Sequence, residues 1–179
     1  GDGVSDDTIS IQNILNTINS GTIYFPKGIY NITNPLIFYG SGVHIIGDGE
    51  STILKAVSNF NGGMIQSVAD SLETPVAMEN SSIEKIKIDC NNQIDVTGIR
   101  LTGFTRGCKI SDCVVTNFVK NGIAISGSWS FLLINNNILG SGVGNGIDLS
   151  LIETGAYKGD SVVNKATILA NTIRGCNLG

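Results

Sequence analysis

The sequence has few charged residues, and those it has are not gathered into a basic cluster. Only 15% of its 179 residues are charged, and the formal net charge is −4. Such a low charge is unusual for a compact α/β enzyme and is typical of a solenoid, whose turns are built from Asn, Ser, Thr and Gly. Without a basic cluster we expect no nucleic-acid partner.

Residues that bind transition metals or form catalytic triads are also scarce. Histidine occurs once, as His44, and no two cysteines form a Cys-x-x-Cys pair. This excludes an ordinary zinc site, and His44 has no evident partner for a Ser-His-Asp arrangement. We expect no metal and no cofactor. We also expect free thiols at the four cysteines, Cys90, Cys108, Cys113 and Cys176.

Long apolar runs are absent, so no segment of the sequence reaches the length of a membrane-spanning helix. We therefore expect no membrane partner. No signal peptide is visible either, but this absence carries little weight, because the chain starts in the middle of a sequence pattern. The length suffices for one domain with a sizeable core, and we expect a piece of a longer protein that is truncated at both ends.

A short phrase recurs three times at a spacing of 24 residues: Gly98–Gly103, Gly122–Gly127 and Gly146–Leu151. Repeats of this length indicate stacked structural units. Apolar and polar residues alternate within each copy, which predicts strands, and the 23 glycines fit many tight turns. We predict an all-β fold, a right-handed single-stranded parallel β-helix whose coils stack about 4.8 Å apart.

The alternation assigns each repeat position to a face. The expected inner columns are Ile99, Ile123, Ile147 and, beside them, Leu101, Ile125, Leu149. The expected outer columns are Arg100, Ala124, Asp148 and then Thr102, Ser126, Ser150. A second phrase places Asp112, Asn136 and Asn171 at one position, where stacked amides can hydrogen-bond from coil to coil. We interpret this column as structural rather than catalytic.

Residues 1–20 differ from the repeats and form a separate N-terminal capping segment in our interpretation, with the β-helix spanning 21–179. Ser5, Asp6 and Asp7 offer N-cap side chains. Apolar residues then follow at helical spacing, which predicts a helix over residues 7–19: Ile11, Ile14, Leu15 and Ile18. We expect this helix to cover the open first coil.

The opening of the chain resembles the start of a known superfamily. The matching segments are Gly1–Thr8, Ile11–Gln12 and Gly21–Tyr30. Together they are similar to the N-terminal signature of the pectate-lyase-like superfamily, which includes phage tail spikes, pre-neck appendage proteins and secreted polysaccharide lyases and hydrolases. The resemblance implies a β-helix and a carbohydrate-related function, and it transfers no catalytic residue.

The outer face and an insertion supply the candidate site residues. The last repeat is 11 residues longer than the others, and we place the extra residues within 152–165. Insertions into coils become surface loops, which often carry function. The candidate catalytic residues are Asp148, Glu153 and Asp160, and the candidate substrate-binding residues are Arg100, Tyr157 and Trp129. The alternatives are scattered solvated charges and, for Trp129, a packing role.

These observations lead to a functional hypothesis. We predict the carbohydrate-active domain of a phage tail-spike or appendage-like depolymerase that cleaves cell-surface polysaccharide or teichoic acid, by hydrolysis. The alternatives are a polysaccharide lyase and a non-catalytic virion structural or glycan-binding adhesin module. We expect a homotrimer in the full-length protein and a virion or extracellular location. Asp89 and Asp95 have two alternative roles, calcium binding through their oxygens and turn formation.

Overall fold

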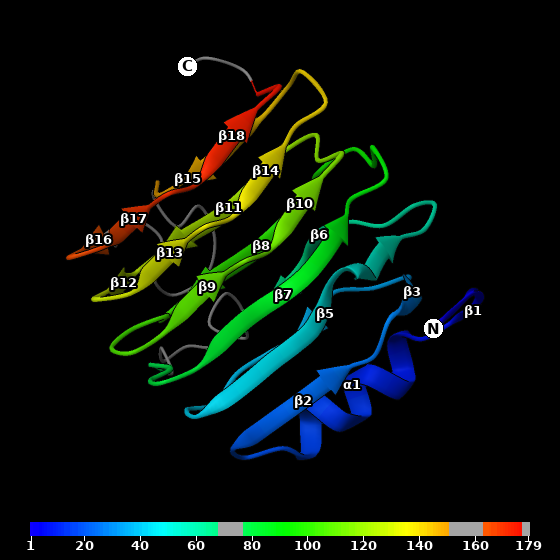
Figure 1. Ribbon diagram of the computed structural model, residues 1–179. Helices are drawn as coiled ribbons and strands as arrows, with labels where there is room; N and C mark the ends of the chain where they lie inside the picture. The colour runs from blue at the N-terminus through cyan, green and yellow to red at the C-terminus, as the bar shows by residue number, and fades with distance from the viewer. Residues whose placement is uncertain (68–76, 151–162, 177–179) are drawn as a thin grey trace.

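The chain forms a parallel β-helix with one short helix near its N-terminus (Figure 1). The computed structural model describes residues 1–67, 77–150 and 163–176. Within these ranges the strand pairs are parallel, and each strand pairs with the equivalent strand of the coil before or after it. The predicted fold class is therefore confirmed.

The stack has three walls, and each wall is a row of equivalent strands from successive coils that pair in parallel. The first consists of β2 (Gly21–Phe25), the N-terminal parts of β5 (Val43–Ala56) and β7 (Ser82–Asp89), then β9 (Lys109–Ser111), β13 (Leu132–Ile134) and β17 (Thr167–Leu169). The second consists of β3 (Gly28–Ile32), the C-terminal parts of β5 and β7, then β10 (Val114–Thr116), β14 (Asn137–Leu139) and β18 (Thr172–Arg174).

The third wall consists of β4 (Leu36–Ile37), β6 (Gly62–Gln66), β8 (Val96–Thr102), β11 (Asn121–Ser126) and β15 (Asn145–Asp148). Two short strands, β12 (Ser128–Trp129) and β16 (Val163–Asn164), pair beside it. A further strand, β1 (Asp2–Asp6), pairs with β3. Strand β1 was not predicted from the sequence, because the segment is short and polar.

The predicted columns of the third wall are present. Ile123 pairs with Ile99 on one side and Ile147 on the other, and Ala124 pairs with Arg100 and Asp148 in the same way. The inner residues of β8 and β11 are fully buried, but Ile147 and Leu149 are only half-buried. The reason is that β15 is the last strand of this wall among the described residues, so no further coil covers it there.

The column of Thr102, Ser126 and Ser150 differs from the expectation. Thr102 is buried, Ser126 is half-buried and only Ser150 is exposed. The hydroxyls of Thr102 and Ser126 lie 3.3 Å apart, and the Thr102 backbone N–H donates to Ser67 Oγ. This position therefore contributes polar contacts between coils rather than an open surface.

Glycine begins each copy of the repeat because there is no room for a side chain. A Cβ on Gly122 would lie 2.6 Å from the Gly146 carbonyl oxygen and 2.6 Å from a methyl group of Ile138. A Cβ on Gly98 would likewise collide with the side chain of Val115, and a Cβ on Gly146 with that of Ile173. Each glycine therefore faces the core, where a side chain of the second wall occupies the space.

The amide column forms, but with a register that differs from the prediction. Asn136 is buried and donates from Nδ2 to Asn171 Oδ1, and its Oδ1 accepts from the Cys113 backbone N–H. Asp112 belongs one position earlier, where its carboxylate accepts from Asn135 Nδ2. The cause is that β10 and β14 are offset by 23 residues, not 24, so the column is Cys113, Asn136, Asn171.

Helix α1 (Thr8–Thr17) lies at the N-terminal end of the stack (Figure 1). Ile11 and Leu15 are buried in the core, and Ile18 packs against it. Ile14 was expected to do the same but is 50% exposed. The side of the helix nearer Gln12 faces the coil, because Gln12 exchanges two hydrogen bonds with the backbone of Ile37.

The cysteines are structural. All four have free thiols, and Cys90, Cys108 and Cys113 are buried. Burial raises the pKa of the Cys113 thiol to about 12, so this group stays protonated at physiological pH. The thiols of the described core therefore act as small apolar side chains.

Candidate functional site

A groove of about 460 Å³ lies on the outer face of the third wall, across the coils that carry β6, β8, β11 and β15. Two outward columns form its floor: Thr97, Asn121, Asn145 and, beside them, Arg100, Ala124, Asp148. Ala124 is the smallest side chain in the second of these columns. It leaves the space between Arg100 and Asp148 open, and the backbones of these two residues are about 9.6 Å apart across two coils.

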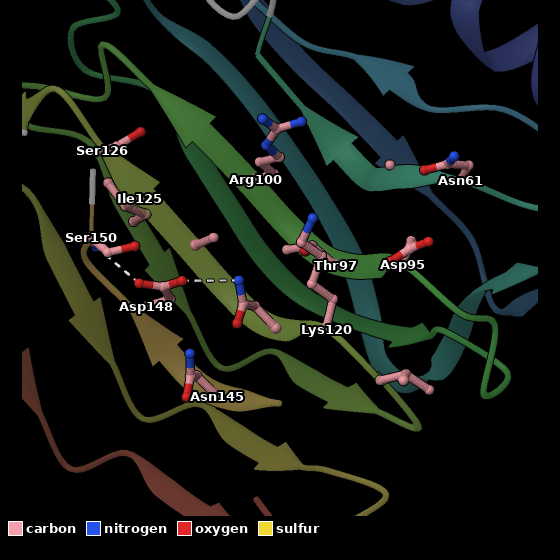
Figure 2. Close-up of a pocket in the computed structure, with 14 residues that line it drawn as sticks. Asn61, Asp95, Thr97, Arg100, Lys120, Ile125, Ser126, Asn145, Asp148 and Ser150 are labelled. Carbon is pink, nitrogen blue, oxygen red and sulfur yellow. Dashed lines mark hydrogen bonds between the residues drawn. The ribbon is translucent and has the colours of Figure 1, made fainter. Parts of the chain in front are cut away.

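Asp148 is held by two hydrogen bonds, one to each oxygen (Figure 2). Its Oδ2 accepts from Asn121 Nδ2 at 3.0 Å, and its Oδ1 accepts from the backbone N–H of Ser150 at 2.9 Å. A carboxylate has about four lone-pair sites, so sites remain for a ligand. Half-burial of Asp148 leaves them accessible from the groove.

Two cations share the groove with this carboxylate. Arg100 comes from β8 and is half-buried, and Lys120 immediately precedes β11 and is exposed. Both side chains can pair with an anionic group, Arg100 in a bidentate manner. The groove therefore combines an acceptor carboxylate with positive charge on the same surface.

Among the described residues that line the groove, one other carboxylate is present, Asp95. It lies on the opposite side of the view in Figure 2 from Asp148. Asp95 comes five residues before Arg100, and Arg100 is two coils from Asp148. At the usual strand and coil spacings their backbones are roughly 15–20 Å apart. This is about twice the roughly 6.5–9.5 Å between the two carboxylates of an inverting glycosidase, a gap that two short aspartate side chains do not close.

The extra residues of the long coil fall between Asp148 and Val163, a range that overlaps the predicted 152–165 but ends before the paired strand β16. Ala124 to Ser128 spans 4 positions, whereas the equivalent Asp148 to Val163 spans 15, a difference of 11. Glu153, Tyr157 and Asp160 fall in this segment and lie outside the described residues. Their predicted roles stay predictions.

Trp129 lies on β12 and is 42% exposed. The described lining of the groove does not include it, so a ligand in the groove would need to extend past β11 to touch Trp129. Its role in substrate binding also stays a prediction.

The sequence pattern did not indicate Lys120, Asn121 and Asn145 as groove residues. Simple alternation from the buried Ile123 places Asn121 inside. However, Gly122 also faces the core, so two consecutive residues point inward and Asn121 returns to the outer face. The signal that could have found it is the Gly-Ile pair, since an inward glycine followed by an inward isoleucine interrupts the alternation.

A second polar cluster links three coils on the first wall. His44 Nδ1 and Ser82 Oγ are 2.8 Å apart, and Ser82 Oγ donates to Glu84 Oε1 at 2.7 Å. Lys109 Nζ lies 2.8 Å from Glu84 Oε2. His44 thus has a serine partner, but Ser82 is buried and directs its proton to Glu84. The arrangement is a link between coils and not a nucleophile activated by histidine.

The carboxylate of Asp89 has a turn-forming role. Its Oδ1 accepts from the Asn91 backbone N–H at 2.9 Å and from Asn117 Nδ2 at 2.8 Å. Within the described ranges no three His, Cys, Asp or Glu side chains gather as a metal site requires. Calcium binding at Asp89 and Asp95 therefore has no support from the described residues.

None of the helical structure in the described residues combines the length and apolar composition that a membrane crossing requires.

Comparison with known proteins places the chain among β-helix proteins. The family described as "Rhamnogalacturonase A/epimerase, pectate lyase-like" matches residues 1–179. Mannuronan C5-epimerases AlgE1 and AlgE2 of Azotobacter vinelandii are both 28% identical to it over 117 residues, or 60% of the chain. The aligned parts cover 8% and 11% of these relatives, so the chain spans a small fraction of their length.

Two solved structures share the fold. ORF18 of Geobacillus virus E2 matches 98% of the chain and 39% of its own, with a TM-score of 0.69 and 20% identity. The A-module of the A. vinelandii mannuronan C-5 epimerase AlgE4 matches 99% of the chain and 50% of its own, with a TM-score of 0.65 and 22% identity. At this level of identity the likeness concerns the fold alone.

Proposed function

Because this chain belongs to the rhamnogalacturonase A/epimerase family of pectate lyase-like proteins, we propose that it is a carbohydrate-active domain that binds an acidic polysaccharide in the groove of the third wall. One observation carries the proposal. The groove joins a hydrogen-bonded carboxylate, Asp148, to two cations, Arg100 and Lys120, on one outer face. Two relatives are named for mannuronan, which is a polymer of this acidic class.

The chemistry that best fits this groove is proton removal next to a sugar carboxylate. Such a reaction needs a base, plus positive charge that stabilises the anion formed on the substrate. Asp148 has lone pairs free for the role of base, and Arg100 and Lys120 can bind the sugar carboxylate. Return of a proton to the opposite face of the same carbon gives epimerisation. If the electron pair instead forms a double bond to the neighbouring carbon, the C–O bond there breaks, the leaving glycosidic oxygen takes a proton, and the product is the unsaturated sugar of a lyase.

The test is to incubate the full-length protein with purified acidic polysaccharides. Unsaturated sugars are followed by their absorbance, epimerised sugars by proton NMR and hydrolysis by reducing ends. We expect unsaturated or epimerised products, and we expect Asp148→Asn to lower the rate by about two or more orders of magnitude. Arg100→Gln and Lys120→Gln should weaken binding of acidic polymers and leave neutral ones unaffected. Full activity of Asp148→Asn would contradict the assignment.

A second candidate is the hydrolytic depolymerase predicted from the sequence. It requires a second carboxylate within reach of Asp148. Glu153 and Asp160 follow Asp148 by 5 and 12 positions, and this nearness in sequence supports the candidate. Teichoic acid would then be a candidate substrate, because the two cations also suit phosphate groups. New reducing ends without unsaturated sugars, lost in Asp148→Asn and in either Glu153→Gln or Asp160→Asn, would favour hydrolysis.

Retention of polymer without any product would instead favour a glycan-binding or structural role. The fold likeness to the viral protein is compatible with a virion location, and a location on a virion or outside the cell stays a proposal. A homotrimer likewise stays a proposal, which sedimentation of the full-length protein would test.

A further inference from the structure

Asn121 lines the groove and is hydrogen-bonded to the proposed base. It is 8% exposed, and its Nδ2 donates to Asp148 Oδ2 at 3.0 Å. An ionised carboxylate only accepts hydrogen bonds, so this contact fixes which end of the amide points at Asp148. The bond also crosses from one coil to the next, because Asn121 lies on β11 and Asp148 on β15.

The immediate surroundings of Asn121 restrict its movement. Gly122 follows it, and a side chain at that position would collide with the backbone of Gly146 and with Ile138, so the strand is closely packed here. On either side in the column, Asn121 pairs with Thr97 and Asn145. A nearly buried amide on a packed strand is a rigid support for a neighbouring carboxylate.

We infer that Asn121 is a positioning residue, which fixes the direction in which Asp148 presents its free lone pairs to a sugar bound between Arg100 and Asp148. This rests on the proposed function of Asp148. The Ser150 N–H fixes Oδ1, and Asn121 fixes Oδ2, so the carboxylate has little freedom to rotate. Without Asn121 the group keeps its anchor at Ser150, which lies past the end of β15, and loses the one on the neighbouring coil.

The chain offers a matched control one coil away. Asn145 occupies the same column and lines the same groove, but its side chain makes no hydrogen bond to Asp148 in the described structure. Substitutions at positions 121 and 145 therefore change the groove in the same chemical way. They differ in whether Asp148 loses its support.

The experiment compares Asn121→Ala, Asn121→Asp, Asn145→Ala and Asn145→Asp in the full-length protein on an acidic polysaccharide. We expect Asn121→Ala to lower kcat roughly ten- to hundredfold with little change in KM, because misplacement of a reacting group by about 1 Å can cost this much. Asn145→Ala should affect KM more than kcat. Equal losses of kcat at the two positions would overturn the inference.

The aspartate variants supply a pH signature that a structural role would not produce. Asn121→Asp keeps the size of the side chain but places a like charge against Asp148, so its rate should be low at neutral pH. Lowering the pH should let the two carboxyls share one proton, which restores a donor, so the rate relative to the wild type should rise. The charged residues Asp95, Arg100 and Lys120 line the same groove and are unchanged in both aspartate variants, so Asn145→Asp should lack this recovery. No recovery in Asn121→Asp would overturn the inference.

A measurement that does not depend on catalytic activity tests this inference separately from the proposed function. Crystal structures of the wild type and of Asn121→Ala should show the Asp148 carboxylate turned away from its original direction in the variant. An unmoved carboxylate would overturn the positioning role even if the enzyme is active. If the wild type turns over no polymer, the proposed reaction fails, and the displaced or unmoved carboxylate still decides what Asn121 does.

Discussion

At the scale of single residues, the glycine that opens each repeat shows how tightly neighbouring walls pack. Gly122 faces a methyl group of Ile138 and the carbonyl of Gly146, both at 2.6 Å from the place where a Cβ would be. The carbonyl belongs to the next coil and cannot move without disturbing its strand pairing. The glycine is therefore required by space and not by a special backbone angle.

Replacing Gly122 with Ala should destabilise the fold by about 1–3 kcal/mol or more, because an added methyl group must displace backbone as well as a core side chain. The free energy of unfolding from urea denaturation measures the effect. Ala124→Ser adds an atom on the outer face two positions later and should change stability by less than about 0.5 kcal/mol. Equal stability of the two variants would show that Gly122 does not face the core.

At the scale of elements, α1 shows what periodicity can and cannot predict. The helical spacing correctly indicated a helix and the burial of Ile11 and Leu15. The same spacing wrongly placed Ile14 in the core. Ile14 follows Ile11 by three positions and therefore lies at the margin of the apolar stripe. The hydrogen bonds of Gln12 to the Ile37 backbone hold the side of the helix nearer Gln12 against the coil and leave Ile14 exposed. These bonds cannot be read from the sequence, because they form only in the folded structure.

Leu15→Ala should therefore cost about 2–5 kcal/mol, the usual range for a buried leucine. Ile14→Ala, a matched truncation on the same helix, should cost much less because the side chain is 50% exposed. Thermal unfolding followed by circular dichroism compares the two. Similar losses would place Ile14 in the core after all.

The residue columns of the walls were likewise predicted only in part. The 24-residue repeat predicted the columns of the third wall, including the shared column of Arg100 and Asp148. It failed for the amide column at the corner between the first and second walls, because β10 and β14 are offset by 23 residues. The missing residue lies at a corner, where sequence carries no periodic signal. Asn121 was missed for a related reason, the interrupted alternation at Gly122.

At the scale of the whole molecule, the cluster around Glu84 ties successive coils together. Partial burial raises the pKa of Glu84, but hydrogen bonds from Lys109 and Ser82 and the charge of Lys109 outweigh it and hold the pKa below its usual range. A lowered pKa in the folded state means that the unfolded chain binds the proton more readily. The contribution to stability is thus present above the ordinary pKa of 4.5 and is lost as the pH falls through the lower folded value.

Glu84→Gln should accordingly be less stable than the wild type at neutral pH, and the difference should shrink as the pH is lowered below about 4.5. Urea denaturation at a series of pH values measures this. Glu50→Gln removes an exposed carboxylate that has no hydrogen-bond partner in the described structure, and it serves as the control. A difference for Glu84→Gln that stays constant with pH would argue against the link.

The offsets of 23, 24 and 35 residues between equivalent strands have a consequence for how such a protein can change. Each coil returns to the same wall register although its length varies, so the corners absorb additions and deletions while the walls keep their pairing. The segment after Asp148 can then be exchanged for one of another length and sequence without rebuilding the stack. New specificities could arise from one insertion event, and chimaeras that swap only this segment should fold.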